Sequence, residues 1–319
     1  MLLALLLLVS LQDTSVFETG GTRVLAGEGS AGEGPAWHPV LGVLTSGRGG
    51  ICRLTSQGAS VIYRANAGTN GLLFDTDGSL LACEPVLRRV TRTRADGSPV
   101  VLTDSFEGHK YNQPNDITVD KQGRIYFSDP RYGPRDGMEQ RDSQGRTVEG
   151  VYRIDRDGKV TRVIGREVER ANGVLVSQSG KYLFVADNNN DSAGGARKLW
   201  RFNRGADGSI NLASKTLLYD WGTGRGPDGL KQDSLGRLFV AAGLNKPNPP
   251  HESDPTVKAG IYVIHPETGA KIDFLPIPTD EVTNCAFGGK DRKTLYVTGG
   301  GTLYAARVKV PGVVVWPTE

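Results

Sequence analysis

Six acidic or amide residues occupy one equivalent position in a sequence block that recurs along the chain. Each block has this polar residue, a short apolar stretch, a turn and a second apolar stretch. The polar position is filled by Glu33, Asn70, Asn115, Asn172, Asp228 and Asn284. Carboxylate and amide oxygens are the ligands of hard cations such as calcium. The chemistry that these residues could support is cation binding and, at an open coordination position, metal-assisted hydrolysis.

The spacing inside the blocks indicates the elements that position these residues. The polar residue lies eight positions before the turn residue in five blocks and nine before it in the first. The turn residue is glycine in five blocks and Arg292 in the sixth, and successive turn residues are 36 to 57 positions apart. The apolar stretches alternate with a period of two, which excludes helical repeats. We therefore predict an all-β, six-bladed β-propeller.

The register predicts where the six polar side chains meet. The first strand of every propeller blade lines the central channel, so equivalent positions face one axis at nearly the same height. Two buried carboxylates, Glu33 and Asp228, would be costly there without a compensating charge. We expect a divalent cation in the channel, with Ca²⁺ preferred because it takes six to eight flexible oxygen ligands, although other divalent cations fit too. The alternative is that these residues only begin strands, as common turn formers do.

One of these residues could also act as an acid or base. Asp228 could accept a proton from an attacking water, whereas Asn115 and Asn172 can only ligate or form hydrogen bonds. Glu33 is better suited to balance charge. The sequence contains no G-x-S-x-G motif and no P-loop motif, which excludes the usual serine nucleophile and phosphate cradle.

Composition excludes several other classes. The 43 glycines and 17 prolines are scattered over 319 residues, which favours one domain of many short strands, over residues 16–319. The net charge of +3 comes from interspersed charges, so we expect no nucleic-acid partner. The three cysteines and four histidines form no zinc-site spacing, and we expect the cysteines to be buried thiols.

The N-terminus has an apolar run over residues 1–10. Its length suits the core of a signal peptide and is too short for a membrane-spanning helix. We interpret residues 1–15 as a signal peptide or a disordered terminus, and expect an exported, periplasmic or secreted protein. A cytoplasmic protein is the alternative, because no lysine or arginine precedes the run. We make no prediction about the oligomeric state.

Several motifs together resemble the gluconolactonase, or SMP-30, family over roughly residues 22–308. They are EGPAW at residues 33–37, NGLLF at 70–74, NQPND at 112–116, IYFSDP at 125–130 and PDG at 227–229. The resemblance implies hydrolysis of a sugar lactone such as glucono-1,5-lactone to the aldonic acid by a six-bladed propeller with calcium in its channel.

The resemblance also implies roles for individual residues. The metal ligands would be Glu33, Asn172, Asp228 and Asn115. The catalytic residues would be Asp228, as acid or base, and Asn115. The substrate-binding residues would be Asn112, Asn115, Glu84, Arg89, Asp129 and Tyr132. We interpret residues 243–260, which are rich in proline, as a loop over the channel entrance or an exposed connection.

Two other functions fit the same architecture. One is hydrolysis of other esters or of phosphotriesters by a calcium-bearing propeller. The other is a non-enzymatic binding module whose loops hold a protein or a sugar. The ring of polar residues argues against the module, because a purely structural propeller more often fills its axis with apolar side chains.

Overall fold

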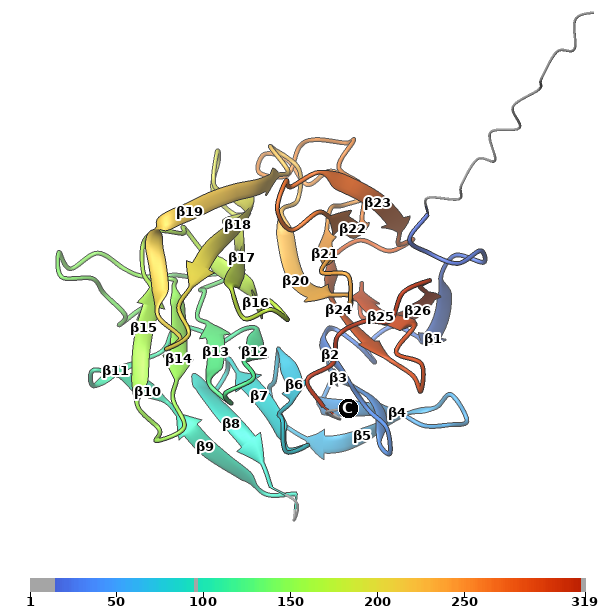
Figure 1. Ribbon diagram of the computed structural model, residues 1–319, viewed down its shortest axis with the longest axis horizontal. Coiled ribbons are helices and arrows are strands. Elements are labelled where there is room, and N and C mark those ends of the chain that lie inside the picture. Colours follow the sequence, from blue (N-terminus) through green and yellow to red (C-terminus); the bar gives the residue numbers. More distant parts are fainter. Residues whose placement is uncertain (1–14, 95–96, 317–319) are drawn as a thin grey trace, which may run out of the picture.

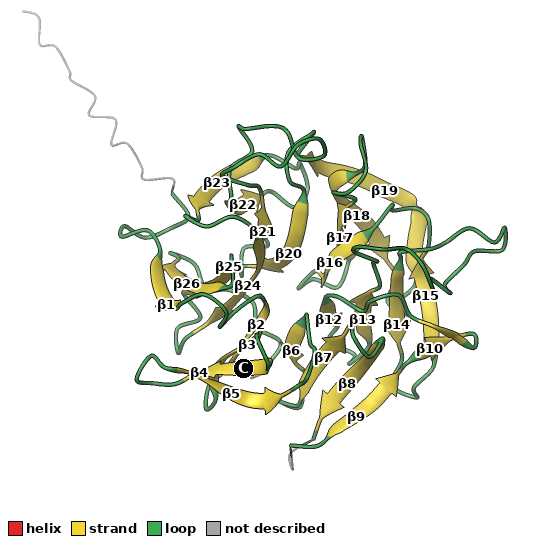
Figure 2. Ribbon diagram, turned by 180° about the vertical axis from the view of Figure 1, so that it is seen from behind, coloured by secondary structure: helices red, strands yellow, loops and turns green. Residues whose placement is uncertain are grey.

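The computed structural model describes residues 15–94 and 97–316, which form six four-stranded antiparallel sheets arranged in a ring (Figure 1). Seen from behind, this part of the chain consists of strands and loops alone (Figure 2). No helix long and apolar enough to cross a bilayer occurs in these residues. The predicted all-β, six-bladed propeller is confirmed. Of the predicted signal segment or disordered terminus, residues 1–15, all but residue 15 lie outside the described residues.

Blades 1 to 3 use consecutive strands, with the innermost strand first. Blade 1 contains β2 (Glu33–His38), β3 (Gly42–Gly47), β4 (Gly50–Leu54) and β5 (Ser60–Ala65). Blade 2 contains β6 (Leu72–Phe74), β7 (Leu80–Glu84), β8 (Arg89–Thr93) and β9 (Pro99–Thr103). Blade 3 contains β12 (Ile117–Val119), β13 (Ile125–Ser128), β14 (Val151–Ile154) and β15 (Val160–Ile164). A small hairpin of β10 (Ser105–Phe106) and β11 (His109–Lys110) precedes blade 3.

Blades 4 to 6 complete the ring. Blade 4 contains β16 (Ala171–Val176), β17 (Tyr182–Asn188), β18 (Arg197–Arg204) and β19 (Ile210–Asp220). Blade 5 contains β20 (Pro227–Gln232), β21 (Leu238–Ala242), β22 (Gly260–Ile264) and β23 (Lys271–Pro276). Blade 6 contains β24 (Val282–Gly288), β25 (Thr294–Gly299), β26 (Thr302–Arg307) and β1 (Arg23–Ala26). Because β1 pairs with β26, the first strand of the chain closes the last blade and leaves no gap in the ring.

The repeated turn after each innermost strand needs a left-handed backbone. The five repeat glycines, Gly42, Gly78, Gly123, Gly180 and Gly236, have φ between 73° and 86°. Arg292 takes the same place in the sixth block with φ 55°. A residue with a Cβ pays roughly 1–2 kcal/mol for that conformation, which is why glycine fills the position elsewhere.

Glycine also follows most of the six polar residues, and there the close approach of the next blade explains it. A Cβ on Gly173 would lie 2.1 Å from the carbonyl oxygen of Asp228, and one on Gly229 would lie 2.0 Å from Cγ of Asn284. In both cases the neighbouring blade approaches the glycine at the axis of the ring. The polar residue and glycine recur as a pair because only a residue without a side chain admits that approach.

The apolar core lies between neighbouring blades. Phe184 and Leu199 of blade 4 pack with Leu238 and Tyr262 of blade 5, and similar clusters fill the other interfaces. Each side chain of this size contributes about 1.5–3 kcal/mol when it is fully buried. This core fixes the blades around the channel.

The two ends of the channel differ. We call the end at which the innermost strands begin the polar end, since it carries Glu33, Asn172 and Asp228. The other end opens into a cavity of about 1060 Å³ lined by the ends of the innermost strands. The C-terminal segment, residues 311–316, lines this cavity, and Trp316 stacks on His38 with ring centroids 4.5 Å apart. Glu33 and Asp228 therefore lie at the end opposite this cavity.

Candidate functional site

Polar side chains from opposite blades meet at the polar end of the channel. Nδ2 of Asn284, in blade 6, lies 3.4 Å from Oδ1 of Asp116, which directly precedes the first strand of blade 3. The pKa of Glu33, in blade 1, is raised well above its usual value by burial and then by the charges of Asp228 and Asp116. Carboxylates from blades 1, 3 and 5 thus share one buried region.

Burial and neighbouring charges have opposing effects on the pKa of the Asp228 carboxyl. Burial raises its pKa to about 7, while the Arg225 guanidinium lowers it and Asp116 raises it again. Such a group exchanges a proton readily near neutral pH, which suits an acid or base. The same region contains a second cation, because Nζ of Lys231 lies 3.5 Å from Oδ1 of Asn284.

Asn172 contributes an oxygen that has no partner in the protein. Its Nδ2 donates to the hydroxyl of Tyr132 at 2.8 Å, whereas its Oδ1 is buried and accepts no hydrogen bond. Asn172 also lowers the pKa of Asp228, which places it beside that carboxylate. A buried amide oxygen without a donor is costly, and a cation would satisfy it.

These donors fit a hard cation by their chemistry. Glu33, Asp228 and Asn172 supply only oxygen, and burial together with mutual repulsion favours a bound positive charge. The site would need amide oxygens as well as carboxylates, because the described residues contain no group of three or more His, Cys, Asp or Glu side chains placed to hold a metal. The predicted metal in the channel stays a prediction that this donor set supports.

Asn115 and Asn112 lie in the segment that leads into β12. Asn115 is buried, and its backbone carbonyl accepts from Gly71 of blade 2 at 2.7 Å. Asn112 donates through Nδ2 to the carbonyl oxygens of Asp129 and Val148, and its buried Oδ1 has no partner. Both residues are buried, and of the two only Asn112 has a side-chain oxygen without a partner in the protein.

Asp129 holds this segment in place. Its two carboxylate oxygens accept from the backbone N–H groups of Asn112 and Gln113, each at 2.8 Å. Burial nevertheless raises the pKa of Asp129 to about 8, and the two hydrogen bonds oppose that rise. The structure gives Asp129 contacts within the protein, and its predicted role in substrate binding is untested.

Glu84 and Arg89, both predicted to bind substrate, contact each other. Arg89 Nε donates to Oε2 of Glu84 at 2.6 Å, and Arg64 and Thr91 occupy Oε1. The pairing follows from strand register, since Glu84 of β7 lies opposite Arg89 of β8. Glu84 is buried while Arg89 is partly exposed, so only the arginine presents surface at this end.

Four residues of the site were not predicted as site residues from the sequence. Asp116 stands where four of the other five blocks have glycine after the polar residue, and that break in the pattern was the available signal. Arg225 lies three residues before Asp228 and pairs with Glu252 at 3.3 Å. Glu252 belongs to the loop of residues 243–260, so this loop contacts the site through Arg225. The sequence placed Glu252 only in a loop expected over the channel entrance, and no sequence signal pointed to Lys231.

The described cysteines match expectation. Cys52, Cys83 and Cys285 are buried free thiols, as predicted. Burial raises the pKa of the Cys285 thiol to about 12, so it stays protonated and unreactive at neutral pH.

Comparison with known proteins places this geometry in a family. A model of the SMP-30/gluconolactonase/LRE-like region matches residues 31–301. The gluconolactonase of Zymomonas mobilis is 28% identical over 258 residues, which cover 77% of this chain and 64% of that protein. The pentonolactonase XacC of Haloferax volcanii is 26% identical over 289 residues, which cover 88% and 85% of the two chains.

Solved structures give the same fold. The gluconolactonase XC5397 of Xanthomonas campestris superposes with a TM-score of 0.72 at 25% identity, covering 90% of this chain and 89% of that one. Regucalcin of Agrobacterium tumefaciens, described as a calcium-binding protein, has a TM-score of 0.71 at 17% identity and covers 92% and 96%. The second likeness supports the fold alone. The family match spans all six polar positions and confirms the resemblance predicted from the motifs: the chain belongs to the SMP-30/gluconolactonase/LRE-like family.

Proposed function

We propose that the protein is a calcium-dependent lactonase that hydrolyses a sugar lactone to the aldonic acid. The observation that carries the proposal is the meeting of Glu33, Asn172 and Asp228 at one end of the channel, with an amide oxygen left without a partner. Relatives named as a gluconolactonase and a pentonolactonase support the substrate class.

The chemistry of each side chain determines its role in the proposed reaction. Glu33, Asn172, Asp228 and Asn115 would hold Ca²⁺, which when bound would polarise the lactone carbonyl. Asp228 accepts a proton from water as the water oxygen adds to the carbonyl carbon. The ring C–O bond then breaks, and the leaving ring oxygen takes the proton back from Asp228. The products are one carboxyl and one hydroxyl group, so water is the only co-reactant.

Substrate recognition would come from the same end of the channel. Asn112 offers a buried oxygen without a partner, and Arg89 offers a partly exposed guanidinium. A lactone with several hydroxyl groups needs donors and acceptors of this kind. We propose that Asn112 and Arg89 contact the sugar, while Glu84 and Asp129 hold these two residues in place through their hydrogen bonds.

A direct test is a pH-stat assay on a panel of aldonolactones, with a phosphotriester and a simple aryl ester as comparison substrates. We expect acid release from glucono-1,5-lactone or a related aldonolactone at a rate well above the spontaneous one. Turnover of the phosphotriester with no turnover of any lactone would replace the proposal with the other hydrolase function. No turnover of any substrate would favour a binding module.

A further inference from the structure

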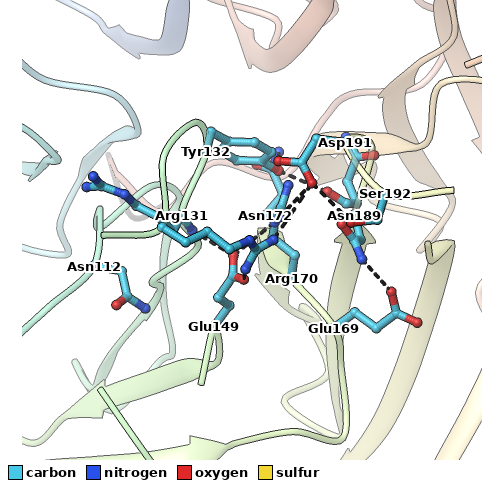
Figure 3. Close-up of polar contacts among 12 residues, drawn as sticks. Asn112, Arg131, Tyr132, Glu149, Glu169, Arg170, Asn172, Asn189, Asp191 and Ser192 are labelled. Carbon is cyan, nitrogen blue, oxygen red and sulfur yellow. Dashed lines mark hydrogen bonds and ion pairs between the residues drawn. The ribbon is translucent and has the colours of Figure 1, made fainter. Parts of the chain in front are cut away.

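A buried network lies behind Asn172 at the polar end of the channel (Figure 3). The Arg170 guanidinium is wholly buried and donates through Nε to Glu149 and through Nη2 to Asp191, each at 2.9 Å. Glu149 also accepts from the backbone N–H of Arg131 at 2.7 Å. Two carboxylates, the buried Glu149 and the exposed Asp191, therefore hold one fully buried guanidinium in a single orientation.

The ring of Tyr132 lies over this guanidinium. Cζ of Arg170 is 5.0 Å from the ring centroid, which is a cation–π contact (Figure 3). The backbone N–H of Tyr132 donates to Oε1 of Gln113 at 2.9 Å. Its hydroxyl donates to the backbone carbonyl of Asn188 at 3.3 Å. The ring face, the backbone and the hydroxyl are thus all fixed by neighbours.

The hydroxyl of Tyr132 determines how Asn172 is oriented. A phenol has one proton, and here that proton goes to Asn188, so the oxygen accepts from Asn172 Nδ2 at 2.8 Å. The other arm of the amide, Oδ1, is then turned away from Tyr132, and it is buried without a partner. Only the oxygen of an amide can bind a cation, so the choice between the two arms decides whether Asn172 can be a ligand.

We propose that Tyr132 is a positioning residue that fixes the Asn172 amide with its oxygen toward the cation site, and that Arg170 holds the Tyr132 ring for this purpose. The inference rests on the proposed function and differs from the direct substrate contact that the family resemblance implied for Tyr132. Partners that orient metal ligands typically change metal affinity by about 10–100-fold when they are removed.

The test is calorimetric titration of calcium into chelator-stripped Tyr132→Phe, which loses the hydroxyl and keeps the ring. We expect a calcium Kd roughly tenfold or more above wild type. The KM for glucono-1,5-lactone at saturating calcium should stay within about twofold of wild type, since a positioning residue does not touch the substrate. The matched control is Tyr182→Phe, because Tyr182 also covers an arginine, Arg201, and donates to Glu267. Tyr182 begins β17 beside Leu183, which pairs with Val176 at the end of β16 away from Asn172, and its variant should keep the wild-type Kd.

A second variant separates orientation from general damage. Asn172→Asp replaces the amide with two equivalent oxygens, so adding Tyr132→Phe to it should change the calcium Kd by less than about twofold. An equal loss in both backgrounds would overturn the proposal. So would a wild-type Kd in Tyr132→Phe, or a raised KM with an unchanged Kd, which would assign Tyr132 to the substrate. Wild-type protein that binds no calcium would refute the proposed function, whereas calcium binding with an unaffected Tyr132→Phe refutes the positioning role alone.

Discussion

The side-chain amide of Asn284 lies 3.4 Å from the carboxylate of Asp116, although the two residues are 168 positions apart in the chain. Blades 6 and 3 stand on opposite sides of the ring, so this contact crosses the axis (Figure 1). The channel is therefore narrow enough here for side chains from opposite walls to touch. Burial in this region, together with the repulsion between its carboxylates, raises the pKa values of Glu33 and Asp228.

Asp116→Asn should weaken the response of the protein to calcium. It removes one of three clustered negative charges, so bound calcium stabilises the folded state less. If affinity falls about tenfold, the calcium-induced rise in Tm should shrink by roughly 2–4 °C. Thermal melts with and without calcium measure this difference, and Asp157→Asn, in an exposed turn, is the matched control. An undiminished calcium-induced rise in Asp116→Asn would show that Asp116 lies outside the charge cluster that matters.

Asp228→Asn should abolish most turnover while leaving the fold intact. The amide is nearly the same size but cannot accept a proton from water, and acid–base catalysis contributes about 10²–10⁴-fold. Steady-state kinetics gives the loss in kcat, and circular dichroism checks the fold. A variant that keeps near-normal kcat would remove Asp228 from the catalytic role.

Asn172→Ala and Asn284→Ala should differ sharply in calcium affinity. The Asn172 oxygen has no partner within the protein, whereas the Asn284 oxygen already accepts from the backbone N–H of Cys285 at 2.9 Å. Only the first is available to a cation, so we expect Asn172→Ala to lose at least about tenfold in affinity and Asn284→Ala to lose little. Calorimetric titration compares the two. Equal losses would mean that the whole polar ring acts as one unit.

The titration of Asp129 should make the free energy of unfolding fall as the pH rises. Its pKa is about 8 in the folded protein and about 4 in an unfolded chain. Between these two pKa values the folded state thus holds a proton that the unfolded state has lost. The stabilisation that Asp129 gives is complete below pH 4 and is lost as the pH approaches 8. Asp129→Asn should flatten this slope in urea unfolding measured between pH 5 and 8, even if the variant is less stable throughout. Asp157→Asn should keep the wild-type slope, and an equal slope in Asp129→Asn would contradict the raised pKa.

The repeat pattern made the fold and the centre of the site predictable. Turn glycines such as Gly180 and Gly236 mark a left-handed backbone that few other residues adopt, so they reveal blade boundaries directly. The residues eight positions earlier must then face the axis, which located Asn172 and Asp228 without any structure.

The contacts around that centre could not be predicted, because they depend on register and on loops. Glu84 pairs with Arg89 only because β7 and β8 align these two residues, and nothing in their spacing says so. Glu252 reaches Arg225 from a loop whose path is not encoded in a repeat. Asp116 broke the glycine pattern, and only the structure shows that its carboxylate turns toward Asn284.

The most direct test of a metal-dependent hydrolytic centre is lactone hydrolysis by wild-type protein stripped of metal and then titrated with calcium. The account predicts that excess EGTA brings the rate down to the spontaneous one and that added calcium restores it, with half-restoration at the calorimetric Kd. Full turnover in excess EGTA would contradict it.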